Sequence, residues 1–177
     1  MSTVSIIIDI AAQELRVLGL PGPRVYPVST ALNGVGEQEG SGRTPRGQHV
    51  VSEKFGGEQP INSVFVGRVP TGEIYSPELA AQHPQRDWIL SRILWLDGLQ
   101  SGFNQGQGCD SHSRYIYIHG TPDTEPMGIA QSHGCVRMRN TDIIELYPLV
   151  EIGTPVDIYE AFPQMVLQAS LAESEAL

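Results

Sequence analysis

Lysine is almost absent from this chain. Lys54 is the only one, and ten arginines supply the remaining positive charges against twenty carboxylates. The formal net charge is −9 and the sequence pI is about 4.9. A nucleic acid needs a basic surface to neutralise its phosphates, so nucleic acid is excluded as an expected partner. Any anionic substrate has to be held by a few local arginines against a negative background.

Long apolar runs are missing as well. No segment approaches the roughly 18 apolar residues of a membrane-spanning helix, so membrane insertion is not expected. The chain begins with Met, has no cationic region near its start, and its first apolar run, residues 4–8, ends before Asp9. These features are not those of a secretory signal, and the expected location is the cytoplasm.

Cysteine is scarce, because only Cys109 and Cys135 are present. A reducing cytoplasm keeps such residues as free thiols rather than as a disulfide. The fold must therefore be held by its apolar core, and 177 residues are enough to bury one.

Turn-forming residues, by contrast, are abundant, with 19 glycines and 13 prolines. Short apolar runs rich in β-branched residues alternate with these breakers, a pattern typical of many short strands. We therefore predict a mainly β fold, a β-sandwich or open barrel, in a single domain over residues 1–162, with a tail over residues 163–177 that is a weak helix or disordered. Residues 88–96 suit a buried central strand, although period alone does not separate this from a buried helix. The expected strands are residues 4–10, 14–18, 24–28, 49–55, 64–69, 88–96, 115–119 and 156–159.

One short helix is expected after residue 140. Asp142 and Glu145 resemble a capping box, and apolar residues follow as far as Leu149. Pro148 and Gly153 limit this helix to about two turns.

Residues 109–139 contain the chemistry-bearing side chains. Both cysteines and three of the five histidines lie there, whereas His49 and His83 are interpreted as surface or loop residues. A thiol reacts as the thiolate, which neighbouring imidazole and guanidinium groups stabilise. His119 ends an expected strand and is a candidate base for the thiol of Cys135.

The motif Ser132-His133-Gly134-Cys135 is the sharpest element of this region. Gly134 lets the backbone approach a substrate closely, as an oxyanion site requires. Arg137 lies two residues after Cys135, so in an extended segment both side chains point to the same face. Arg137 is therefore expected to steady the thiolate or to bind a substrate carboxylate.

The segments His119-Gly120 and Ser132-His133-Gly134-Cys135, with Arg137 two residues on, strongly resemble the L,D-transpeptidase catalytic-domain family, also called the YkuD type. Thr44-Pro45-Arg46-Gly47 is similar to the TPxG turn of that family, and residues 153–159 are similar to its final strand. The resemblance covers residues 4–160. The twelve-residue loop between His119 and Ser132 is slightly shorter than is usual in the family.

This resemblance implies a cysteine enzyme that acts on peptidoglycan stem peptides and uses no cofactor or metal. Its target would be the bond between the L-centre of diaminopimelate and the following D-alanine. Cys135 would be the nucleophile and His119 the base, oriented by the Gly120 carbonyl. His133 would lie on the other side of the thiol, and amides near Gly134 would form the oxyanion hole. The residues expected to bind substrate are Ser132, Arg137 and Arg114.

Two acceptors are compatible with this chemistry. Water gives an L,D-carboxypeptidase, which a cytoplasmic location favours because only soluble precursors or recycled muropeptides are present there. An amine gives an L,D-transpeptidase that forms wall cross-links or exchanges D-amino acids. The first is the preferred interpretation.

Two other classes of protein are weighed against these enzymes. A zinc site would use Cys109 and His112, whose spacing is plausible, together with His119, His133 and Cys135. A binding module would keep the fold without catalysis. The intact set of motif residues argues against the second alternative.

Overall fold

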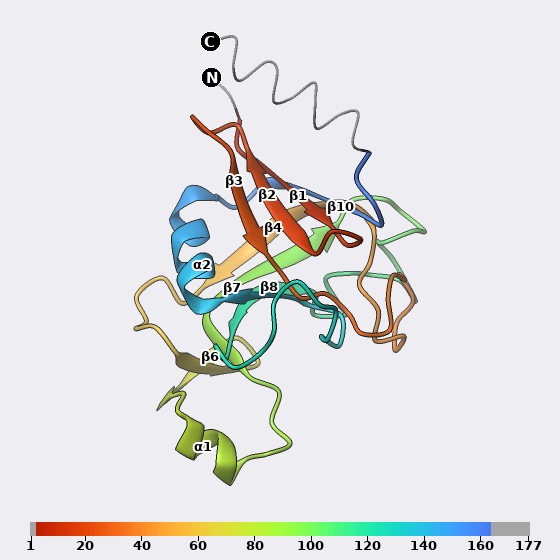
Figure 1. Ribbon diagram of the computed structural model, residues 1–177. Coiled ribbons are helices and arrows are strands. Elements are labelled where there is room, and N and C mark those ends of the chain that lie inside the picture. Colours follow the sequence, from red (N-terminus) through yellow and green to blue (C-terminus); the bar gives the residue numbers. More distant parts are fainter. Residues whose placement is uncertain (1–2, 164–177) are drawn as a thin grey trace.

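Ten strands of residues 3–163, the part of the chain that the computed structural model describes, belong to one curled sheet (Figure 1). The strand order is β3-β2-β1-β10-β4-β7-β5-β6, and β8 pairs with β7 and then with β9. This confirms the expected mainly β fold. The strands are β1 (Ser5–Asp9), β2 (Glu14–Leu18), β3 (Arg24–Pro27), β4 (Gly47–Phe55), β5 (Ser63–Val66), β6 (Val69–Ile74), β7 (Ile89–Gly98), β8 (Tyr117–Thr121), β9 (Val136–Arg139) and β10 (Pro155–Tyr159).

The expected strand over residues 88–96 is confirmed: it is β7, which lies between β4 and β5. Three other predictions about the strands need correction. Residues 64–69, expected as one strand, are split by a tight turn at Gly67 and Arg68 into the hairpin β5–β6. Residues 136–139 form β9, which was not expected as a strand, and residues 115–116 precede β8 rather than belong to it. The expected tail lies outside the described residues from residue 164 on.

Two short helices and one 3₁₀ turn complete the described chain. Helix α1 (Pro77–Gln82) was not predicted; it begins where the Ser76 hydroxyl accepts a hydrogen bond from the Leu79 amide, with Pro77 in the first turn. Helix α2 (Asn140–Leu146) continues into the 3₁₀ turn Tyr147–Leu149. It starts two residues before Asp142, after Arg139, so the predicted capping box is wrong.

The main core lies between α2 and the inner face of the sheet. Alternate residues of β8 and β9, such as Ile118, Val136 and Met138, are fully buried there against Ile143 and Leu146 of α2. The intervening residues of β8 and β9 therefore point to the opposite face. That opposite face is where the candidate site forms.

The hairpin β5–β6 and α1 lie at the end of the molecule away from β1–β3 (Figure 1). No helix among residues 3–163 has both the length and the apolar character needed to cross a bilayer.

Candidate active site

The parallel pairing of β8 with β9 sets the position of the thiol. His119 is opposite Arg137 in the ladder, so Cys135, just before β9, is beside Tyr117. The Tyr117 amide donates to the Cys135 sulfur at 3.4 Å, and the thiol donates to the Tyr115 carbonyl at 3.3 Å. Both contacts come from the backbone, so the half-buried thiol is held by the strand itself.

His119 is on the same face of the next strand and is almost completely buried. Its Nδ1 lies 2.6 Å from the Gly120 carbonyl oxygen, the contact that the family resemblance implies. Because a carbonyl only accepts, Nδ1 carries the proton and Nε2 keeps its lone pair. Burial lowers the pKa of His119, so the imidazole is neutral and suited to accept a proton.

The turn before the thiol is fixed by Ser132. Its hydroxyl donates to the Cys135 carbonyl at 2.5 Å and accepts from the Gly134 amide at 3.2 Å. The Thr44 hydroxyl donates to the Gly134 carbonyl at 2.9 Å, and Gly134 has a φ of +138°. Ser132 therefore stabilises the turn, and its hydroxyl is already engaged in these hydrogen bonds rather than free to bind substrate. They also occupy the Gly134 amide, which leaves the amide of Cys135 as the candidate oxyanion donor.

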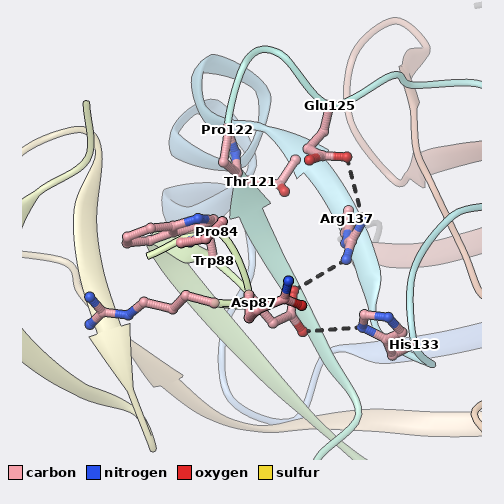
Figure 2. Close-up of a pocket in the computed structure, with 10 residues that line it drawn as sticks. Pro84, Asp87, Trp88, Thr121, Pro122, Glu125, His133 and Arg137 are labelled. Carbon is pink, nitrogen blue, oxygen red and sulfur yellow. Dashed lines mark hydrogen bonds and ion pairs between the residues drawn. The ribbon is translucent and has the colours of Figure 1, made fainter. Parts of the chain in front are cut away.

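A carboxylate that the sequence reasoning missed lies at the centre of the polar side of the site. Asp87, just before β7, accepts from Arg137 Nη2 at 3.2 Å and lies 3.5 Å from His133 Nδ1 (Figure 2). Glu125 is 3.8 Å from the Nη1 of Arg137. Arg137 therefore points to the same face as Cys135, as expected, but its charge is already met by two carboxylates.

A small cavity of about 210 Å³ opens beside these groups (Figure 2). Residues 84–88 form one wall, and Thr121, Pro122 and Glu125 form the other. His133 and Arg137 also line it, and the His133 side chain is 78% exposed. The lining combines two carboxylates, of Asp87 and Glu125, with two guanidinium groups, of Arg86 and Arg137, so the cavity is polar and suited to charged ligands.

Burial decides the charge state of the thiol. It raises the pKa of Cys135 to about 11, and the negative charge of Asp87 acts in the same direction. The Tyr117 amide, Arg137 and Arg114 lower the pKa but do not outweigh burial. The neighbouring cations do favour the thiolate, as expected, but burial outweighs them, so the resting molecule holds a neutral thiol.

Arg114 has a different position from the one expected. Its guanidinium donates to the carbonyls of Gly36, Glu37 and Arg43 and lies 3.4 Å from the Ser41 hydroxyl. These bonds hold the loop 36–43 in place, so the geometry does not support a role in binding substrate.

An aromatic wall forms the other side of the thiol. Cys135 packs against a cluster that includes Trp95 and Tyr117. His112 stacks on Trp95 with ring centroids 3.8 Å apart and an interplanar angle of 11°, and Tyr115 lies 5.9 Å from Trp95. Trp95 is 7% exposed, in agreement with its interpretation as a core residue.

The zinc alternative finds no support in the geometry. Cys109 is half-buried, and its sulfur lies 3.7 Å from the carbonyls of Gln105 and Gly106 in its own loop. Nowhere in residues 3–163 do three His, Cys, Asp or Glu side chains gather closely enough to hold a metal ion.

Known proteins resemble this chain in sequence and in fold. The model of a family described as the L,D-transpeptidase catalytic domain matches residues 3–158. The YkuD protein of Bacillus licheniformis is 49% identical over 41 residues, which are 23% of this chain and 25% of that protein. The YbiS protein of Escherichia coli K12 is 45% identical over 47 residues, 27% of this chain and 15% of that protein. Both carry L,D-transpeptidase names.

Two solved structures share the fold at lower sequence identity. L,D-transpeptidase 3 from Mycobacterium tuberculosis has a TM-score of 0.53 at 20% identity, covering 89% of this chain and 61% of that one. Bd1075 of Bdellovibrio bacteriovorus has a TM-score of 0.53 at 17% identity, covering 99% of this chain and 55% of that one. The chain thus spans less than two thirds of the length of each of these proteins.

Proposed function

The chain belongs to the L,D-transpeptidase catalytic-domain family, and from this premise we propose that it cleaves the diaminopimelate–D-alanine bond of peptidoglycan stem tetrapeptides. The observation that carries the proposal is the pairing of a strand-held thiol, Cys135, with a neutral imidazole, His119, on one face of β8 and β9. This pair is the minimum that nucleophilic acyl transfer requires.

The first half of the reaction forms a thioester. In the resting molecule the thiol proton is donated to the Tyr115 carbonyl. When a substrate carbonyl approaches, His119 Nε2 takes this proton as the sulfur attacks, and it later returns the proton to the departing amine of D-alanine. The amide of Cys135 stabilises the charge that develops on the carbonyl oxygen.

Because both groups start neutral, attack and proton transfer are coupled to substrate binding. No thiolate–imidazolium pair exists beforehand, since burial raises the pKa of the thiol to about 11 and lowers that of His119. The Nδ1 contact with Gly120 supplies the partner that an imidazolium needs during the reaction.

We propose further that water is the main acceptor of the acyl group, so that the products are a tripeptide and D-alanine. The cavity of about 210 Å³ is smaller than the roughly 300–1,000 Å³ of pockets for drug-sized ligands. It suits one amino acid better than a second stem peptide, and the exposed His133 leaves a path for solvent. Soluble muropeptides undergoing recycling in the cytoplasm are the substrates that we propose.

The decisive experiment incubates the protein with a disaccharide-tetrapeptide and with the free tetrapeptide, and identifies the products by mass. Tripeptide and D-alanine are expected. Cross-linked dimers or exchanged D-amino acids as main products would instead establish an amine acceptor.

Three variants test the residues assigned to the reaction. Cys135→Ala should abolish turnover, whereas Cys109→Ala should retain most of it, because only Cys135 lies beside the strand β8 that carries His119. His119→Ala should reduce the rate by about 100-fold or more, the usual scale for a positioned base. Full activity in Cys135→Ala, or an acyl adduct on Cys109, would disprove the assignment.

A further inference from the structure

The tight turn of the β5–β6 hairpin places an arginine in an unfavourable backbone conformation. Val66 pairs with Val69, and the two residues between them have positive φ angles, 54° for Gly67 and 68° for Arg68. Such turns prefer Asn or Gly at these positions, because side chains other than these are strained there. An arginine kept in this conformation is a candidate functional residue.

The Arg68 side chain extends from this turn onto the aromatic wall beside the thiol. Its guanidinium lies 4.2 Å from the centre of the Trp95 ring and 5.4 Å from that of Tyr115, and its Nη1 donates to the Tyr117 hydroxyl at 2.8 Å.

The thiol of Cys135 uses the same residues. Its sulfur accepts from the Tyr117 amide and donates to the Tyr115 carbonyl, and its side chain packs against the cluster that contains Trp95. Tyr115 also has a positive φ, 58°. Arg68 and the nucleophile therefore contact the same aromatic wall.

Arg68 is also the arginine near the thiol whose charge is not met by a carboxylate. Arg137 contacts Asp87 and Glu125, and Arg114 is bonded to backbone carbonyls. Within residues 3–163, the Tyr117 hydroxyl is the only hydrogen-bond acceptor of Arg68, and no ion pair includes it. A guanidinium that lies over an aromatic ring can still donate from its other N–H groups to a carboxylate.

We propose that Arg68 binds a carboxylate of the substrate and orients the scissile bond towards Cys135. This inference rests on the proposed function for the identity of the substrate. A stem tetrapeptide offers two such groups near the scissile bond, the terminal carboxylate of D-alanine and the carboxylate at the far end of the diaminopimelate side chain. Arg68 thus has the role in carboxylate binding that the sequence analysis expected for Arg137 and Arg114.

Equilibrium binding tests this inference without requiring turnover. Calorimetry would compare Cys135→Ala with Cys135→Ala/Arg68→Gln, using a tetrapeptide with both carboxylates free, one amidated at the terminus and one amidated on the side chain. Arg68→Gln should weaken binding of the free acid about 10- to 100-fold, the range of a charge-assisted hydrogen bond. One of the two amidated peptides lacks the carboxylate that Arg68 binds, and Arg68→Gln should not change the affinity for that peptide. The peptide that is unaffected therefore identifies the carboxylate that Arg68 recognises.

A matched variant separates this role from simple packing. Arg92 also lies over an aromatic ring, 5.6 Å from that of Tyr147, and donates to the carbonyls of Gln59 and Ser91. Arg92→Gln should not change the affinity for any of the peptides. Arg68→Lys keeps the positive charge but loses the two-pronged donor geometry of the guanidinium. Its affinity for the free acid should lie between those of Arg68→Gln and the parent Cys135→Ala.

Three results would overturn the inference. They are equal loss of affinity for all three peptides in Arg68→Gln, no loss for any of them, and no peptide binding to Cys135→Ala. If the peptides bind with the expected discrimination but the native protein does not turn them over, the proposed function fails while the carboxylate site stands.

Discussion

The thiol of Cys135 and the imidazole of His119 are both neutral in the resting molecule, because both are withdrawn from water. Asp87 adds to this effect at the thiol, since its negative charge raises the pKa of Cys135. The same carboxylate contacts Arg137 and His133, so it neutralises one cation that would otherwise favour the thiolate. Asp87 thus adds to burial, the main cause, in raising the pKa of the nucleophile.

Replacing Asp87 by Asn should therefore make the thiol more reactive towards alkylation. The native protein should react with iodoacetamide with a midpoint near pH 11, well above the roughly 8.5 of a free cysteine. In Asp87→Asn the midpoint should move to lower pH. The rate of alkylation as a function of pH measures both values.

Glu125→Gln is the control for this experiment, because Glu125 also contacts Arg137 but at 3.8 Å and without touching His133. Its midpoint should stay closer to that of the native protein. An unchanged midpoint in Asp87→Asn would contradict the role assigned to that carboxylate.

His49 is a second buried histidine, contrary to its interpretation as a surface or loop residue. It is 1% exposed, contacts the Gly47 carbonyl at 3.0 Å and lies 2.8 Å from the Ser111 hydroxyl. Burial lowers its pKa from 6.5 to about 4. The unfolded chain therefore binds a proton on His49 at a higher pH than the folded one does.

Stability should accordingly fall as the pH falls from about 6.5 to about 4. The contribution of His49 is complete above pH 6.5, and about 3 kcal/mol is lost by pH 4, from a shift of that size. In His49→Gln this part of the pH dependence should disappear. Urea unfolding at pH 7.5 and at pH 5 measures it, with the exposed His83→Gln as control. Equal acid sensitivity in His49→Gln and in the native protein would contradict this account.

At the scale of elements, β8 has to approach β7 and α2 closely at the residue that orients the base. A Cβ added to Gly120 would lie 2.5 Å from the Leu90 carbonyl oxygen and 2.6 Å from the Asn140 Oδ1. Such distances force the backbone to move, and the carbonyl that contacts His119 belongs to the same residue.

Gly120→Ala should therefore reduce both stability and activity. We expect a loss of about 1–3 kcal/mol, as is typical of overpacking, together with a slower reaction because the contact of His119 with the Gly120 carbonyl is displaced. Denaturant unfolding and turnover measure the two effects. Gly57→Ala, whose Cβ would lie 3.2 Å from the Tyr147 ring, is a milder control. Native activity in Gly120→Ala would show that the carbonyl does not orient the base.

At the scale of the molecule, strand β10 connects two parts of the sheet, β1–β3 on one side and the strands from β4 onward on the other. Strand β10 pairs in parallel with β1 and antiparallel with β4, so it links β1–β3 to the strands that carry the site. The sheet should therefore unfold as one cooperative unit.

Ile158→Ala tests this cooperativity, because the Ile158 side chain is 2% exposed in β10. It should cost about 2–5 kcal/mol, whereas Ile152→Ala, 65% exposed, should change stability by less than about 0.5 kcal/mol. The transitions seen by far-UV circular dichroism and by the fluorescence of the two tryptophans, Trp88 and Trp95, should shift together. Separate transitions would show that the two parts of the sheet are independent.

Local sequence patterns were sufficient to predict the mainly β fold, strands such as β2 and β7, and membership of the family. Alternation along a strand and the spacing within Ser132-His133-Gly134-Cys135 are short-range properties, and they survive in the linear chain. The face shared by Cys135 and Arg137 follows from the same alternation. Helix α1 and the true start of α2 were missed because each depends on one or two residues at a boundary.

The residues that lie near the thiol but far from it in sequence could not be predicted from such local patterns. Asp87 and Arg68 are single charged residues in irregular or turn segments, with no periodicity to mark them, and Asp87 lies 46 and 50 positions from its partners His133 and Arg137. The curled sheet brings these segments close to the residues that surround Cys135. Folding also sets the charge of the thiol, because the pKa depends on how much water and which charges surround it, and these are decided by packing rather than by neighbours in sequence.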